Sequence, residues 1–178
     1  MITYLLLYLS IALGVSFVCS LLESTLMSTT LSYINLREEE GYKPALLMKK
    51  YKTETERPLA AILSLNTIAN TVGASGVGMQ ATLLFGAAWF GVCSAIMTIL
   101  ILVFSEIFPK TIGTTYWKKL MGLAAHTIRV LIIVMWPIVK MIELISRLFP
   151  EPDEAVVSRE EVIAMANVGE EEGVIEED

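Results

Sequence analysis

Three groups of polar side chains interrupt stretches of this sequence that are otherwise apolar. They are Ser20, Glu23 and Ser24; Ser64, Asn66 and Asn70; and Ser105, Glu106, Pro109 and Lys110. A carboxylate inside a membrane segment costs about 2.5–3.5 kcal/mol on insertion scales, so such residues are rare and usually functional. Carboxylate, hydroxyl and amide oxygens are the ligands that hard cations prefer. The three groups therefore predict a cation site.

The spacing within the first two groups supports a shared site. Ser20, Glu23 and Ser24 are related as i, i+3 and i+4, which puts them on one face of a helix. Asn66 and Asn70 are four residues apart and also share a face. Several oxygen ligands from such faces can reach one ion.

A proline in the third group points the same way. Pro109 cannot donate a backbone hydrogen bond, which frees the carbonyl of Ser105 for another partner. Broken helices recur at the ion sites of transporters for this reason. Gly113, just beyond, could bring another carbonyl close to an ion.

The elements that must position these groups are predicted to be membrane helices. The 178 residues are 54% hydrophobic, with a mean hydropathy of +0.63, more apolar than a soluble domain of this size usually is. A helix needs about 20 residues to cross the hydrocarbon core. Spans are expected at about 2–27, 59–84 and 87–108, giving an all-α membrane protein. Glycines at 73, 76 and 78 would allow close helix approach in the second span.

The distribution of basic residues orients these spans. Residues 30–57 contain six Lys and Arg residues, whereas the turn near Gly86 contains none. The positive-inside rule then makes 30–57 cytoplasmic and puts the amino terminus outside. In this orientation all three polar groups are expected at a similar depth, on the cytoplasmic side of the midplane.

The stretch 120–149 is long enough for a fourth span, but its charges favour another arrangement. Its polar residues share an arc of about 100° on a helix of 3.6-residue period; they are His126, Arg129, Lys140, Glu143 and Arg147. An amphipathic belt helix in the interface, kinked at Pro137, keeps these groups in water. A fourth span remains the alternative if this face packs inside an oligomer.

Residues 150–178 differ from the rest of the chain. They are expected to form a cytosolic, acidic helical segment that opens with the capping-box pattern Ser158-Arg-Glu-Glu161. Residues 151–178 hold eleven acids and one base, a net charge of −10, against a net charge of +4 for residues 1–150. This acidic balance argues against nucleic-acid binding.

Other classes of chemistry find little support. Cys19 and Cys93 lie in apolar runs, so no disulfide framework or zinc site is indicated. The single histidine, His126, has no nucleophile–base partner, so we expect no enzyme. The first apolar run lacks a basic segment before it and a small-residue cleavage site after it, so it is predicted to be a retained helix.

Structural roles for the same polar residues stay open at this point. A membrane serine often donates to the carbonyl four residues earlier, and an asparagine can hold two helices together. Glu23 or Glu106 could pair with Lys110 or carry a proton, and Lys110 could extend to the headgroups.

Together the polar groups and the segments Ser105-Glu-Ile-Phe-Pro-Lys110 and Gly169-Glu-Glu-Glu-Gly173 resemble the CNNM/CorC family of magnesium transporters. The resemblance implies three spans, a belt-like juxtamembrane helix, an acidic helical bundle and a homodimer in the cell membrane. It implies export of Mg²⁺, with Na⁺ as the proposed coupling ion. Nucleotide-binding CBS modules normally follow this region in the family and are absent from this sequence.

The resemblance also assigns residues to the ion site. It places Ser20, Ser24, Asn66, Asn70 and Glu106 in or beside the site, with Glu23 and Gly113 as additions. Transport by alternating access is the expected mechanism. A membrane-anchored magnesium sensor, or a sodium site without divalent selectivity, would use the same ligands, so the sequence leaves both open.

Overall fold

The computed structural model describes residues 2–146, and this part of the chain is entirely helical. Residues through Glu143 form one compact unit, to which the contacts below belong. The elements are α1 (Ile2–Ser28), α2 (Leu31–Glu39), α3 (Lys43–Thr53), α4 (Glu56–Phe85), the 3₁₀ turn η1 (Ala87–Trp89), α5 (Phe90–Leu100), the π-helical η2 (Ile101–Ile107), α6 (Phe108–Val134) and α7 (Trp136–Ser146). The acidic segment expected at 150–178 lies outside the described residues.

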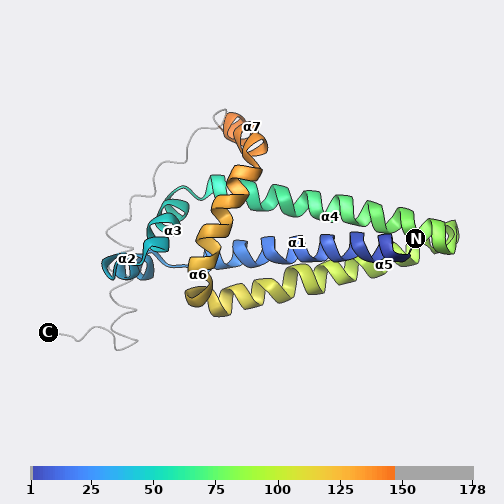
Figure 1. The fold of residues 1–178 in the computed structure, drawn as a ribbon, viewed down its shortest axis with the longest axis horizontal. Coiled ribbons are helices and arrows are strands. Elements are labelled where there is room, and N and C mark those ends of the chain that lie inside the picture. The colour runs from blue at the N-terminus through green and yellow to red at the C-terminus, as the bar shows by residue number, and fades with distance from the viewer. Residues whose placement is uncertain (1, 147–178) are drawn as a thin grey trace, which may run out of the picture. The chain divides into compact units, whose positions relative to one another are not determined.

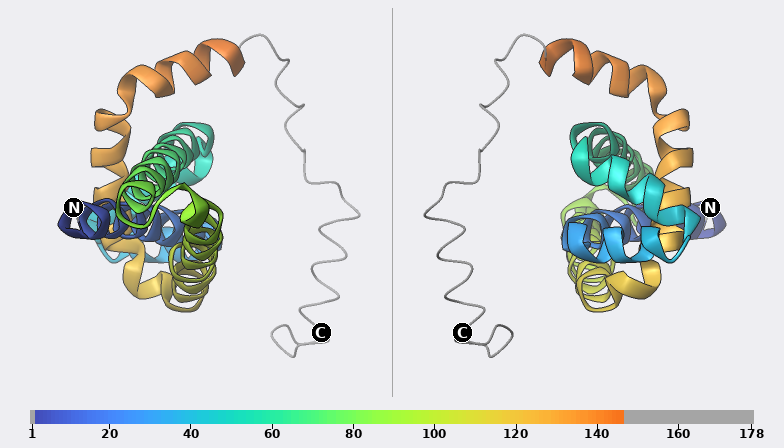
Figure 2. Two further views of the ribbon diagram at one scale, coloured as in Figure 1. Left: turned by 90° about the vertical axis from the view of Figure 1, so that its right-hand side faces the viewer. Right: turned by 90° about the vertical axis from the view of Figure 1, so that its left-hand side faces the viewer.

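Helix α1 is the centre of the bundle (Figure 1). It packs against α4 on one side and against η2 and the start of α6 on the other, while α4 and η2 barely touch each other. Helix α4 runs antiparallel to α1. The chain reverses again at Gly86, where φ is +88°, so the α5–η2 stretch runs parallel to α1. The end views in Figure 2 show α1 with both neighbours.

Glycines let α4 approach α1 closely. A Cβ placed on Gly73 would lie 2.2 Å from the Cβ of Ala12, and one on Gly76 would lie 2.5 Å from the Tyr8 ring. A larger side chain at either position would force the helices apart. The small-residue run thus packs two helices together, as the sequence predicted.

Two helical runs in the described residues are long and apolar enough to cross a membrane. They are Ile2–Ser28, with a mean hydropathy of 2.4, and a part of Ala87–Val134, with 2.3. Helix α4 has 30 residues, a sufficient length. Its polar side chains, Asn66 and Asn70 among them, lower its mean hydropathy, so α4 is not one of the two runs. The three-span arrangement stays a prediction.

The helix that contains the third polar group continues beyond the expected end at 108. It passes from η2 into α6 without a break and bends at Tyr116, where φ is −109° and ψ is 19°. After the bend, α6 crosses α1 and α4 (Figure 1). It ends at Val134, because Pro137 has no N–H for the carbonyl of Ile133. The predicted kink at Pro137 is therefore a break between α6 and α7.

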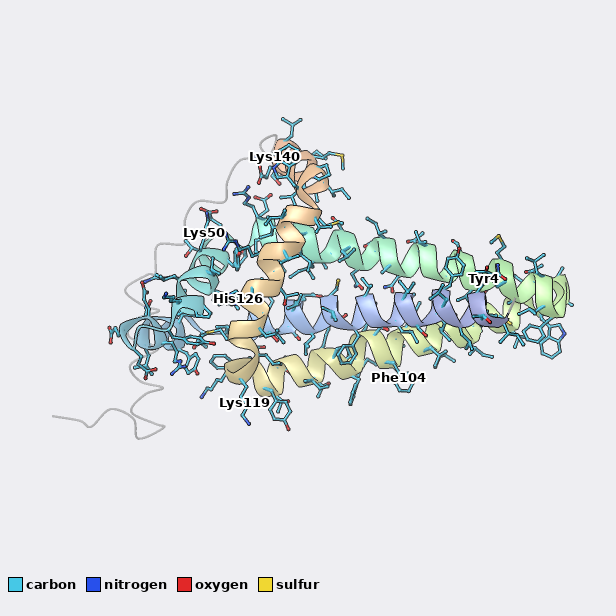
Figure 3. The ribbon with its side chains drawn as sticks, in the orientation of Figure 1. Tyr4, Lys50, Phe104, Lys119, His126 and Lys140 are labelled. Atoms are coloured by element: carbon cyan, nitrogen blue, oxygen red, sulfur yellow. The ribbon has the colours of Figure 1, made fainter. Side chains whose placement is uncertain are left out.

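The basic loop also folds. Gly41, with a φ of +78°, ends α2, and Pro44 lies in the first turn of α3. The Lys52 ammonium donates to the carbonyls of Leu26 at 3.3 Å and Met27 at 2.7 Å, so α3 satisfies the carboxyl end of α1. Charged and polar side chains gather at this end of the bundle, as Lys50, Lys119, His126 and Lys140 show in Figure 3.

Candidate ion site

Side-chain hydrogen bonds tie α1 to both of its neighbours at one level. The Ser16 hydroxyl, fully buried, donates to Oδ1 of Asn66 at 2.6 Å. On the other side of α1, the buried Ser105 hydroxyl donates to the carbonyl of Leu13 at 3.2 Å. We call this depth of the bundle the first level; Asn70, one turn from Asn66, and Glu106, next to Ser105, adjoin it. It joins the second and third polar groups of the sequence through α1.

A second level surrounds Ser24. Its hydroxyl donates to the carbonyls of Ser20 at 2.9 Å and Leu21 at 3.1 Å. Gly113 of α6 lies against it, since a Cβ at position 113 would be 1.9 Å from the Ser24 oxygen. Glu23 forms an ion pair with Lys110 at 3.3 Å, one of the alternatives that the sequence left open.

The two levels are well separated along α1. From Ser16 to Ser24 is eight residues, or about 12 Å at 1.5 Å per residue. Magnesium ligands lie about 2.0–2.1 Å from the ion. One ion therefore cannot take ligands from both levels in this arrangement. Asn66 of the second group and Ser105 of the third do share a depth, whereas Ser20 and Ser24 lie one to two turns nearer the α2–α3 end. Lys110, the last residue of the third group, reaches the depth of Glu23.

Some buried oxygen atoms have no hydrogen-bond partner. These are the side-chain oxygens of Ser20, Thr25 and Asn70. Leaving a buried polar group unsatisfied costs about 1–3 kcal/mol, so such groups call for an explanation. Hydroxyl and amide oxygens are suitable ligands for a hard cation, and two of these three belong to the predicted site.

The backbone around Glu106 is unusual. In η2 the N–H of Phe108 donates to the carbonyl of Val103, the i−5 pattern of a π-helix. Pro109 has no N–H, so residue 109 supplies no bond to the carbonyl of Phe104 or of Ser105. Short π-helical turns are frequent at functional sites. The proline after Ser105 was the one signal of this turn in the sequence, and it did not predict the geometry.

The two carboxylates of the predicted site differ in their surroundings. Glu106 is half-buried, and no ion pair among residues 2–146 involves it. Glu23 is paired with Lys110. Ser64 is half-buried and Pro109 is buried. Glu106 is thus the carboxylate whose charge is not already matched within the described part of the chain.

Ser16 is a residue that the sequence-based prediction missed. It lies four residues before Ser20 and eight before Ser24, so the three form one row along α1. That spacing was the signal that could have found it. Within residues 2–146 no three His, Cys, Asp or Glu side chains come together as a metal-binding group. Any ion here would depend largely on hydroxyl, amide and backbone oxygens.

Comparison with known proteins decides the family. Residues 7–178 match the family described as the cyclin M transmembrane N-terminal domain, CNNM. The chain belongs to the CNNM family. It is 35% identical to the UPF0053 protein sll1254 of Synechocystis over 162 residues, which cover 90% of this chain and 47% of that protein. The resemblance seen in the sequence is confirmed.

More distant relatives of this CNNM domain are found in other organisms. The UPF0053 inner membrane protein YfjD of Escherichia coli is 26% identical over 121 residues, covering 67% of this chain and 28% of that protein. A chloroplastic DUF21 domain-containing protein of Arabidopsis thaliana is 25% identical over 179 residues, covering 97% and 27%. The chain spans less than half the length of these curated relatives. It is a CNNM membrane domain, a description consistent with transport of a divalent cation.

Proposed function

We propose that this CNNM domain transports a divalent cation, with Mg²⁺ as its cargo and Na⁺ as the coupling ion. The observation that carries the proposal is the set of buried side-chain oxygens without partners, Ser20 and Asn70, on helices of an otherwise apolar bundle. Such oxygens suit a hard cation, and they make no hydrogen bond that holds the described helices together.

The two levels provide separate stopping points for the ion. At the first level, Asn66, Asn70 and Glu106 would supply amide and carboxylate oxygens beside the carbonyls that Pro109 leaves without a helical donor. At the second level, the hydroxyls of Ser20 and Ser24 and the chain near Gly113 would take over. Relative movement of α1 and its neighbours would pass the ion from one level to the other.

Binding at the first level must displace an existing contact. The Ser16 hydroxyl occupies Oδ1 of Asn66 at 2.6 Å, so that oxygen becomes a ligand only when the hydrogen bond opens. The bond holds α1 against α4. Its exchange for an ion would therefore couple ligand binding to the position of α1, which is what alternating access requires.

The proposal includes a membrane orientation and an assembly. The basic α2–α3 region lies on the cytoplasmic side and the amino terminus outside, following the positive-inside rule. The second level is then the one nearer the cytoplasm. A homodimer in the cell membrane accords with the family, and the E. coli relative is described as an inner membrane protein.

Ion flux in proteoliposomes tests this function. A magnesium-sensitive dye is enclosed and a sodium gradient imposed, and Asn70→Ala and Glu106→Gln are compared with the matched controls Thr71→Ala and Glu39→Gln, both at exposed positions. A lost ligand to a charged ion is worth about 1.5–3 kcal/mol, so flux should fall about tenfold or more in the first pair only.

The possible results separate the functions. Wild-type flux in Glu106→Gln would remove that residue from the mechanism. Magnesium binding that both site variants abolish, without any flux in the unmodified chain, would indicate a sensor instead. Sodium movement without magnesium movement would indicate a site that lacks divalent selectivity.

A further inference from the structure

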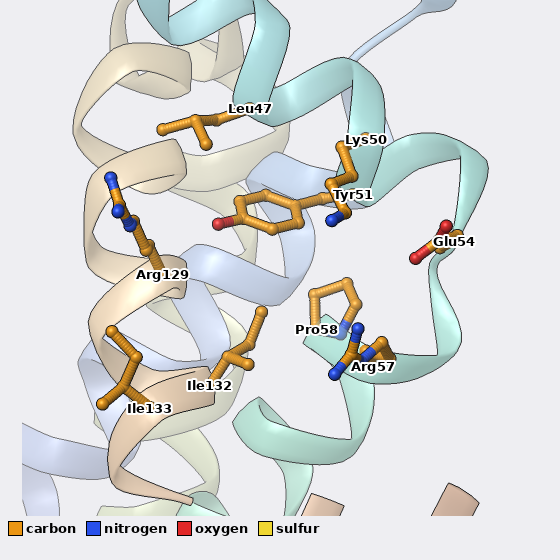
Figure 4. Close-up of a pocket in the computed structure, with 9 residues that line it drawn as sticks. All are labelled: Leu47, Lys50, Tyr51, Glu54, Arg57, Pro58, Arg129, Ile132 and Ile133. Atoms are coloured by element: carbon orange, nitrogen blue, oxygen red, sulfur yellow. The ribbon is translucent and has the colours of Figure 1, made fainter. Parts of the chain in front are cut away.

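A cavity of about 370 Å³ lies between α3, the start of α4 and α6, away from the candidate ion site (Figure 4). Three cationic side chains line it, Lys50 of α3, Arg57 of α4 and Arg129 of α6, and one carboxylate, Glu54. Cations that separate elements contribute to one concave surface raise the positive potential there. In Figure 4 Lys50 and Arg57 lie on one side of the Tyr51 ring and Arg129 lies on the other. The cavity is therefore suited to an anion.

The positive charge is only partly matched within the described residues. Arg57 Nε lies 2.6 Å from Oε1 of Glu143, but the other oxygen of Glu143 lies 2.8 Å from the Lys140 ammonium. One carboxylate is thus shared by two cations. No ion pair among residues 2–146 involves Lys50 or Arg129, and both side chains are exposed.

The cavity is apolar on its α6 side. Ile132 and Ile133 form part of its wall, and Ile133 is 65% exposed. Val130 and Val134 of the same helix are 57% and 60% exposed, so an apolar strip leads away from the cations. A cationic cavity that continues into an apolar strip matches a molecule with an anionic head and a hydrocarbon tail.

We propose that this cavity binds the phosphate headgroup of an anionic phospholipid. Lys50 and Arg129 attract the anionic headgroup from either side of Tyr51, and the acyl chains follow the strip at Val130, Ile133 and Val134. The Tyr51 side chain lies in the cavity between α3 and α6 (Figure 4), where its hydroxyl can donate to a phosphate oxygen. Basic pockets beside membrane helices recognise anionic headgroups in this way. The site requires a membrane position for α6 and does not depend on ion transport.

Native mass spectrometry of the detergent-solubilised chain tests the proposal. The chain is titrated with phosphatidylglycerol or with phosphatidylcholine, and the double variant Lys50→Gln/Arg129→Gln is compared with Lys118→Gln/Lys119→Gln. The control removes the same charge from exposed lysines near the bend of α6, which do not line the cavity. Loss of two headgroup-binding cations should weaken phosphatidylglycerol binding about tenfold or more, while the control retains it.

Several outcomes would overturn the proposal. Equal losses in the two double variants would indicate a general effect of charge, and equal binding of phosphatidylcholine would indicate an apolar groove alone. A third arm adds inorganic phosphate without lipid and follows thermal unfolding. If phosphate stabilises the chain as much as phosphatidylglycerol does, the cavity takes phosphate from solution and not from a lipid.

Folding of the variants is checked independently. Helical circular dichroism and thermal unfolding without lipid should match the unmodified chain, because Lys50 and Arg129 are exposed. If the double variant does not fold, Lys50→Gln alone replaces it, with an expected loss of about threefold and Lys118→Gln as its control. Unchanged lipid binding in a folded Lys50→Gln chain would contradict the assigned headgroup contact.

Discussion

The helical bundle and the basic end of the molecule handle polar groups in opposite ways. In the bundle the buried polar side chains are neutral and short. Some bind each other or the backbone, as Ser16 and Asn66 do, and others, such as Ser20 and Asn70, have an oxygen without a partner. At the α2–α3 end the polar groups are charged, partly exposed and held in ion pairs such as Lys49–Glu38. Each region follows the solvent expected around it, hydrocarbon in one and water in the other.

This difference affects how function can be built. A neutral hydroxyl or amide can stay inside an apolar bundle at modest cost and still serve as an ion ligand. An exposed cation at the basic end keeps its hydration, so its charge adds little to the free energy of folding. Such a cation is available to bind an anion. The candidate ion site and the proposed headgroup cavity accordingly lie in different regions and select ligands of opposite charge.

If the bundle is packed more rigidly than the basic end, the largest difference in stability between the two regions is expected at their glycines. Gly73→Ala should destabilise the chain by about 2–3 kcal/mol, because the new Cβ would lie 2.2 Å from that of Ala12, which has no rotamer to change. Gly122→Ala at the basic end places its Cβ 2.0 Å from the Tyr42 hydroxyl, the end of a side chain that can swing away. There the cost should be below about 1 kcal/mol. Thermal unfolding in detergent, followed by helical circular dichroism, measures both.

Two further variants control this result. Gly14→Ala is the matched control within α1, since nothing lies within 4 Å of the position that its Cβ would occupy. It should be neutral or slightly stabilising, because alanine favours a helix over glycine. Adding Ala12→Gly to Gly73→Ala should restore most of the lost stability. Equal losses at positions 14, 73 and 122 would mean that close packing of α1 on α4 is not the cause.

A double-mutant cycle compares pairs in the two regions. Ser16→Ala and Asn66→Ala, alone and together, should give a coupling energy of about 1 kcal/mol, within the range of membrane hydrogen bonds. Lys49→Met and Glu38→Gln should give about 0.3–0.5 kcal/mol, since both side chains are partly exposed and water screens the pair. Unfolding in a denaturing detergent gives the four free energies of each cycle.

The salt dependence of the two cycles separates them further. Raising the salt concentration should reduce the Lys49–Glu38 coupling and leave the Ser16–Asn66 coupling unchanged, because only the first joins charges. A larger coupling for the exposed ion pair than for the buried hydrogen bond would contradict the contrast between the two regions.

The sequence predicted the helical class and the close approach of the α4 glycines to another helix. Regular spacing carries that information, since positions four apart share a helical face whatever the helix packs against. Ser24 and Asn66 could therefore be placed on faces. Their partners could not, because the partner of Ser24 is its own backbone and that of Asn66 is Ser16 of another helix.

Depth was harder to predict than face. The register between α1 and its neighbours is fixed by contacts such as Gly73 against Ala12 and Ser105 against Leu13. A hydropathy pattern does not predict such contacts. The prediction that all the polar groups lie at an equal depth therefore assumed how far each helix is shifted along α1, which the sequence does not show. The π-helical turn at η2 shows a similar limit, because Pro109 signals a disturbed helix without specifying how the preceding residues adjust.

The smallest expected effect lies at the basic end, in the titration of Tyr51. Burial raises the pKa of this phenol above its ordinary value of 10.0, and the nearby Arg129 guanidinium opposes that rise. A folded pKa above the unfolded one means that the neutral phenol adds stability below pH 10, which is lost as the pH rises through the folded pKa. Arg129→Gln removes the opposing charge, so the pKa of Tyr51 should rise further.

Absorbance near 295 nm, with the Tyr51→Phe titration subtracted, isolates this phenol. A lower pKa in Arg129→Gln would show that Arg129 does not stabilise the phenolate, and would weaken its assignment as an anion-binding cation of the cavity.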